Sequence, residues 1–167
     1  MNGRRTGRVL LAGGLLLTLL VAGCGVRPSH VITGRSAVSG PSVGTGLYLL
    51  GQGELVLVLR PAKVDASPAN ALTLLAAGPE ENERGQGLTS EVPVGLGPVT
   101  VTAGADRSSG LTVRTTSAAR SLSANAADQI ICTVAEAAAR VGLVEDFAPV
   151  TIVGPDGARP PRPCPIK

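Results

Sequence analysis

The sequence predicts an α+β fold, a small mixed sheet with two helices, in the order strand, strand, helix, strand, strand, helix, strand. Three observations lead to this prediction. Short apolar runs with strand spacing are separated by glycine turns. Two other segments show helical periodicity and begin at a serine suited to capping. Residues 24–167 suit one domain with a core of Val, Leu, Ile and Ala.

The first two strands are predicted at residues 46–50 and 54–60. Gly51-Gln52-Gly53 between them is typical of a hairpin turn. The second strand reads as a nearly continuous apolar run, so we expect it to be buried on both faces or to lie centrally in the sheet.

A helix is predicted to start at Ser67-Pro68, because serine caps free amides and proline suits the first helical position. An apolar stripe within 71–75 would face the core, and Gly78-Pro79 would end the helix. Residues 80–84, which include three glutamates, are then predicted to form a short helical turn. We interpret this turn as a solvated helix face, with a metal site as the alternative.

The second half predicts a hairpin, a long helix and a final strand. Residues 98–103 and 111–116 alternate with period two around the loop 104–110, and 149–153 forms the last strand. The helix spans about 124–140, with Ser123 as its cap and Gly142 at its end. The proline-rich tail, 155–167, can be neither a helix nor a central strand.

The N-terminus is typical of a signal peptide, residues 1–23. Arg4, Arg5 and Arg8 precede an uncharged run that, at about 14 residues, is shorter than the roughly 20 that a spanning helix needs. The run ends in Val21-Ala22-Gly23-Cys24, which resembles a lipobox, although leucine is usual at its first position. The resemblance implies cleavage after Gly23 and a diacylglycerol on the Cys24 sulfur. The alternative is an ordinary secretory signal with an incidental cysteine.

Residues 24–45 are rich in Gly, Ser and Pro and are predicted to form a lipidated tether. With Cys24 carrying lipid, Cys132 and Cys164 remain as an even pair in an oxidising compartment, so we predict a disulfide between them. Helical spacing places Cys132 well off the apolar face, which suits a cysteine that fastens the tail from outside. The alternative is two free thiols.

Composition argues against several function classes. Three of the fifteen cations leave with the leader, and the remaining twelve match twelve acids, so a nucleic-acid partner is not expected. Tyr48 and Phe147 are the only aromatic residues. The single histidine, His30, lies in the tether, and no nucleophile elbow or zinc-ligand spacing occurs. We expect no enzyme, no cofactor and no metal; the pair Glu145-Asp146 is interpreted as solvated.

Two segments resemble the signature of GerMN domains. Residues 71–79, ALTLLAAGP, are similar to its "A-L-L-x-G-P" helix, and 83–93, ERGQGLTSEVP, to the acidic turn and "G-L-x-T-x-x-P" that follow. Residues 128–133 also resemble the helix of actinobacterial GerMN lipoproteins, so the likeness covers about 46–154. Ser90, where threonine is common, and the low aromatic content of the first strand depart from the pattern.

The resemblance implies a small α+β domain of envelope, sporulation or germination proteins that acts in assembly or interaction and brings no catalytic mechanism or defined binding residues. We therefore expect a lipoprotein on the extracytoplasmic face of the cell membrane with an envelope protein as partner. The alternative is a lipoprotein that binds a small ligand or the cell wall. The acidic turn, Glu80 to Arg84, and the loop 87–93 are the predicted interaction surface.

Overall fold

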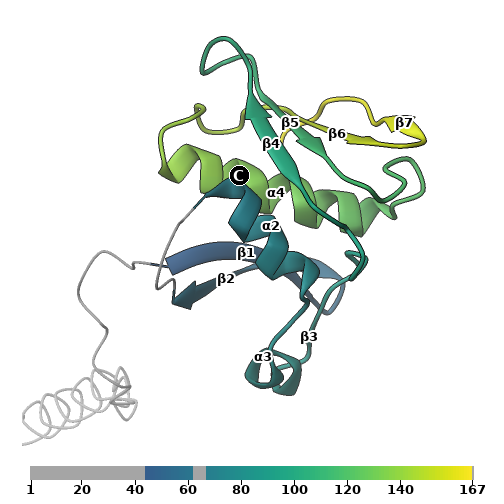
Figure 1. The fold of residues 1–167 in the computed structure, drawn as a ribbon. Helices are drawn as coiled ribbons and strands as arrows, with labels where there is room; N and C mark the ends of the chain where they lie inside the picture. The colour runs from purple at the N-terminus through teal and green to yellow at the C-terminus, as the bar shows by residue number, and fades with distance from the viewer. Residues whose placement is uncertain (1–43, 62–66, 167) are drawn as a thin grey trace, which may run out of the picture. The chain divides into compact units, whose positions relative to one another are not determined.

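The computed structural model describes residues 44–61 and 67–166, and these form an α+β domain (Figure 1). The fold class and the order of the main elements agree with the prediction. In chain order the elements are β1 (Gly44–Gly51), β2 (Glu54–Pro61), α2 (Pro68–Ala76), α3 (Glu81–Gly85), β3 (Leu88–Thr89), β4 (Thr100–Ala103), β5 (Leu111–Arg114), α4 (Ala124–Arg140), β6 (Val150–Gly154) and β7 (Gly157–Ala158).

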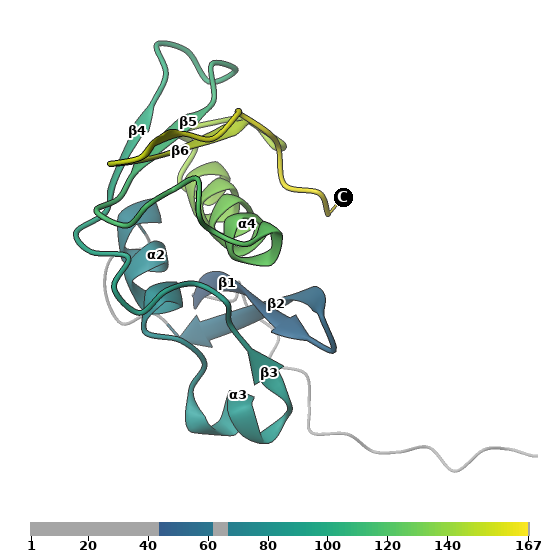
Figure 2. The ribbon, with the colours of Figure 1, turned by 90° about the vertical axis from the view of Figure 1, so that its right-hand side faces the viewer.

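The strands form two sheets, where the sequence predicted one. One sheet has the order β2-β1-β3 and the other the order β4-β5-β6-β7. Figures 1 and 2 show α2 and α4 lying between the two sheets, so the domain has three layers. The burial of α4 explains the difference: buried residues occur along most of its length and on more than one face, so a single sheet could not cover it.

A hairpin joins β1 and β2 where the sequence predicted one, but its turn has two residues, Gln52 and Gly53, because Gly51 is already paired with Glu54. Gln52 and Gly53 both have positive φ, 54° and 87°, which matches the twist of the flanking strands. The register runs from Gly51 opposite Glu54 to Gly44 opposite Pro61. The first strand therefore begins at Gly44, inside the segment predicted as tether.

The predicted burial of the second strand is wrong. β2 is an edge strand, and Val56, Leu57 and Leu59 are 38%, 43% and 44% exposed. The central position belongs to β1, which pairs with β2 over its full length and with β3 at Leu50 and Gly51. An apolar run shows that a strand is suited to burial, but the number of strands that flank it in the sheet decides whether it is buried.

The two main helices start where their caps predict. The Ser67 hydroxyl accepts a hydrogen bond from the Asn70 amide, and the Ser123 hydroxyl accepts one from Ala126. Pro68 is in the first helical turn of α2. No helix in the described part of the chain is long and apolar enough to cross a bilayer.

The C-terminal residues form part of the second sheet. β6 pairs in parallel with β5 and turns back into the short β7, within the segment predicted as tail. Further along, Arg162 exchanges backbone hydrogen bonds with Val150, at 2.9 and 3.2 Å. The tail is thus held by β6 as well as by its cysteine.

Candidate functional site

Of the predicted site residues, the structure brings together Cys132 and Cys164, which form a disulfide across 32 positions of sequence. The bond joins the middle of α4 to the C-terminal tail. Cys24, the predicted lipid attachment residue, lies outside the described residues.

Cys132 is buried, although helical spacing places it off the apolar face of α4. Its side chain is 1% exposed, because the tail that it fastens also covers it. An ion pair reinforces this contact: the Arg162 guanidinium lies 2.6 Å from the carboxylate of Asp128, one turn before Cys132 on α4. The tail is therefore attached to α4 at two points and to β6 at a third.

A hollow of about 240 Å³ lies beside the disulfide. Its lining includes Tyr48, Cys132, Glu136, Asp146, Phe147, Cys164 and Ile166. Burial, and then the nearby Glu136 carboxylate, raise the pKa of the Tyr48 phenol above its ordinary value. Phe147 at the rim is exposed and has a φ of 65°, which is rare for an aromatic residue. The hollow thus combines an apolar floor with two carboxylates.

Two buried polar residues of α4 connect it to the first sheet. The Tyr48 amide donates to the Thr133 hydroxyl at 3.0 Å, and the Gln129 side-chain amide donates to the Tyr48 carbonyl at 2.9 Å. The Gln129 side-chain oxygen also accepts the Glu91 amide at 2.9 Å. Gln129 and Thr133 are fully buried, and their side chains occupy the edge of β1 that faces away from β2.

The predicted solvated face at residues 80–84 needs correction at one position. Glu83 is buried, and its carboxylate receives two hydrogen bonds from Arg60 of β2, at 2.6 and 2.9 Å. These bonds lower the pKa of Glu83 below its ordinary value. The Arg60 guanidinium also donates to the carbonyls of Leu74 and Gly78. This side chain thus joins β2, the end of α2 and α3.

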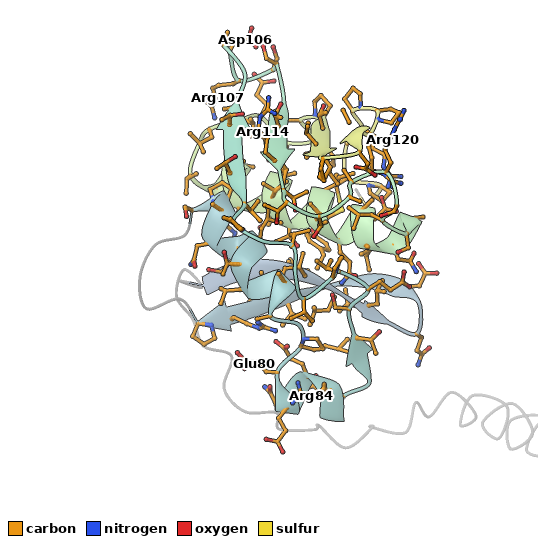
Figure 3. The ribbon with its side chains drawn as sticks, turned by 45° about the vertical axis from the view of Figure 1, so that its right-hand side comes forward. Glu80, Arg84, Asp106, Arg107, Arg114 and Arg120 are labelled. Atoms are coloured by element: carbon orange, nitrogen blue, oxygen red, sulfur yellow. A yellow bond between two sulfur atoms is a disulfide. The ribbon has the colours of Figure 1, made fainter. Side chains whose placement is uncertain are left out.

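Two other members of that turn are exposed, although each also has a contact within the domain: the Glu80 carboxylate lies 3.6 Å from Arg60, and the Arg84 guanidinium donates to the Pro79 carbonyl. Figure 3 shows Glu80 and Arg84 projecting from the α3 region, at the opposite end of the domain from Asp106 and Arg107. Both Glu80 and Arg84 are exposed. Part of the predicted interaction surface is therefore available, while Glu83 serves the fold.

In the loop 87–93, Glu91 and Val92 are engaged in contacts within the domain. The Glu91 carboxylate accepts hydrogen bonds from the Ser123 hydroxyl and the Asn125 amide at the start of α4, and both bonds lower the pKa of Glu91. Val92 beside it is buried in the core. The loop thus holds the first turn of α4 in place.

Sequence reasoning missed the exposed edge of β2 as a candidate surface. The signal for it was present, because Pro61 ends the strand and proline is confined to edges and ends of sheets. Within residues 44–61 and 67–166, no group of three His, Cys, Asp or Glu side chains is placed to hold a metal ion.

Comparison with known proteins gives no relative to set beside this geometry. No family model, no curated protein and no solved structure matches the chain.

Proposed function

We propose that this chain is an exported lipoprotein, held at the extracytoplasmic face of the cell membrane by lipid on Cys24, whose GerMN-like domain is an interaction and assembly module of the cell envelope. The leader at 1–23 and the lipobox-like residues that end it support export and anchoring. Two or more acyl chains hold a protein firmly, whereas one binds marginally.

The observation that carries the proposal is the Cys132–Cys164 disulfide. Such bonds persist in oxidising compartments and are rare in the reducing cytosol. Because the bond uses both cysteines of the domain, Cys24 is the one cysteine of the sequence that remains for lipid attachment. The disulfide and the leader therefore both support a location of the domain on the extracytoplasmic side of the membrane.

The segment between the proposed lipid and the domain carries a small positive charge, which suits a position near lipid headgroups on either face of a membrane. Residues 24–43 include Arg27 and Arg35 and no acidic residue. Basic residues close to an anionic lipid surface favour binding to it by about 1 kcal/mol each. The tether would then lie near the headgroups with the domain beyond it.

An interaction role fits the side chains that the domain offers. The ionisable residues described above, Arg60, Glu83, Glu91 and Asp128, are engaged in holding elements together. Exposed apolar side chains on the β2 edge, and Phe147 beside the hollow, are available to a partner together with the exposed Glu80 and Arg84. Surfaces of this kind are typical of contacts with other proteins.

Mass spectrometry of the mature protein tests the anchor. We expect a chain that begins at Cys24 with a diacylglycerol on its sulfur, and a Cys24→Ser variant that leaves the membrane fraction. An unmodified Cys24, or a mature chain that begins elsewhere, would contradict the proposal.

Crosslinking in intact cells tests the assembly role. Partners captured by the anchored protein above the background of an unrelated lipoprotein would support it, and none above that background would count against it. The alternative, a lipoprotein for a small ligand or cell-wall fragment, is favoured by the hollow beside the disulfide. At about 240 Å³ this hollow is smaller than most ligand pockets, which are about 300–1,000 Å³. A rise in melting temperature with wall fragments would favour this alternative.

A further inference from the structure

β2 has an open edge along the side that faces away from β1, within the described part of the chain. Tyr48 of β1 turns its backbone amide and carbonyl toward Thr133 and Gln129, away from β2. Tyr48 stands opposite Leu57 in the register. In an antiparallel pair of this kind both residues turn their backbone groups away from each other. The amide and carbonyl of Leu57 therefore point to the open edge.

The same geometry repeats at every second residue of the strand. Leu55 and Leu59 therefore also present their amides and carbonyls to the open edge. Pro61 is the next such position, and it ends the row because proline has no amide hydrogen. Among the described residues, these three leucines thus supply the free amides of this edge, and Pro61 can add only a carbonyl.

Within residues 44–61 and 67–166, nothing protects this edge against pairing in the usual way. Natural edge strands are blunted by lysine, proline, bulges or a covering element, but residues 55–59 are all Leu or Val and pair with β1 without a bulge. By contrast, α4 and β3 close the other edge of β1. Leu57 and Leu59 also expose their side chains. The strand is therefore suited to accept another strand.

We propose that β2 is a self-association strand, through which two copies of this chain pair antiparallel about a two-fold axis at Leu57 and form one continuous six-stranded sheet. In this register Leu57 faces Leu57 of the second copy, and Leu55 faces its Leu59. Each of these pairs exchanges two backbone hydrogen bonds. The inference rests on the proposed function, since it names one partner of the assembly module.

The sequence of the strand favours a second copy as the occupant. Antiparallel pairing about Leu57 is self-complementary, because each Val56 then faces Val58 and each leucine faces a leucine. The strand has Glu54 at one end and Arg60 at the other. In an antiparallel pair each Glu54 lies opposite an Arg60 of the second copy, whereas in a parallel pair the two Glu54 residues would lie opposite each other. Arg60 is already bound by Glu83, so the charge argument for an antiparallel direction rests mainly on keeping the two Glu54 carboxylates apart.

The size of the contact sets the expected strength. Eight residues at about 3.4 Å each give a strip about 27 Å long, which covers less than the roughly 1,200 Å² of a stable soluble complex. The contact is therefore weak between free molecules. Tethering both copies to one membrane raises their effective concentration and makes pairing effective there.

Cysteine crosslinking of the full chain in membranes tests the register. Facing residues in such a pair have Cα atoms about 5.5 Å apart, within reach of a disulfide. We expect Leu57→Cys to form a disulfide-linked dimer at least about tenfold more than Val94→Cys, a matched control in a loop where Val94 is 86% exposed. Leu55→Cys and Leu59→Cys should each stay monomeric alone but crosslink when expressed together, because like positions lie about 14 Å apart.

A second experiment introduces a lysine at the centre of the β2 edge. Leu57→Lys, added to both chains of the Leu55→Cys and Leu59→Cys mixture, should abolish the crosslink, whereas Val94→Lys should leave it. Peptide mapping of the native Cys132–Cys164 bond checks that each variant folds.

Equal crosslinking at Val94 and Leu57 overturns the inference, as does self-crosslinking of Leu55→Cys alone. The mass of Cys24 in the same samples separates the two proposals: lipid without crosslink rejects only pairing, and crosslink without lipid rejects only the anchor.

Discussion

Replacing Glu83 with glutamine tests the buried ion pair most directly. Glutamine keeps the shape of the side chain but removes the charge that Arg60 binds at 2.6 and 2.9 Å. The two side chains are 8% and 6% exposed, so solvent screens the interaction little. The Arg60 guanidinium would remain buried and only partly compensated, because the nearest other carboxylate, that of Glu80, lies 3.6 Å away and is mostly exposed.

The expected loss is about 3 kcal/mol. Removing one partner of a buried pair typically costs about 3–5 kcal/mol. The low end applies, since Arg60 keeps its hydrogen bonds to the carbonyls of Leu74 and Gly78. For a domain of this size the loss corresponds to a fall of about 10 °C in melting temperature. Glu81→Gln, an exposed change in the same helix, should stay within about 0.5 kcal/mol of wild type.

The pH dependence gives an independent readout. Because folding lowers the pKa of Glu83, its charge stabilises the folded state fully above the ordinary glutamate pKa, and this contribution is lost as pH falls through the folded pKa. The difference between wild type and Glu83→Gln in urea unfolding should therefore be largest near pH 7 and shrink in acid. A variant as stable as wild type at pH 7, or a difference that grows in acid, would refute the assigned role of the pair.

Three further changes probe other contacts. Cys164→Ala should lower the free energy of unfolding by about 3 kcal/mol in the chain-entropy model, measured against wild type by urea unfolding without reductant; no loss would mean that the tail contacts suffice. Gln129→Leu should cost about 1–3 kcal/mol by leaving the Tyr48 carbonyl unpaired, and native-state hydrogen exchange should speed up around β1; unchanged exchange would contradict the bridge. Gly110→Ala should destabilise more than Gly53→Ala in thermal unfolding, because a Cβ at Gly110 would lie 2.3 Å from a backbone oxygen whereas Gly53 has open space; equal losses would argue against the close approach.

The elements with local signals could be predicted from the sequence. Serines before α2 and α4 and the turn at residues 51–53 fix boundaries through nearby atoms alone, and the structure has the two caps and the turn at these places. The disulfide followed from counting cysteines after Cys24 was set aside. Each of these inferences depends on covalent chemistry or on a few adjacent residues.

The missed features depend on contacts between distant segments. The apolar run of β2 does not say how many strands flank it, and the pairing of Arg60 with Glu83 joins residues 23 positions apart. Gln129 and Thr133 did carry a readable signal, since polar residues four apart lie on one side of a helix. Their partner, the backbone of β1, could not be named without the tertiary structure.

The position of β1 has a mechanical consequence. The segment that the proposed function ties to the membrane joins the domain at Gly44, the first residue of this central strand. A force on that segment acts on a strand that is paired with β2 over eight residues. Side chains of α4 also form hydrogen bonds with the opposite edge of this strand. If the protein is anchored as proposed, a force on its N-terminal end would act on this central strand, and many hydrogen bonds would have to break together before the domain unfolds.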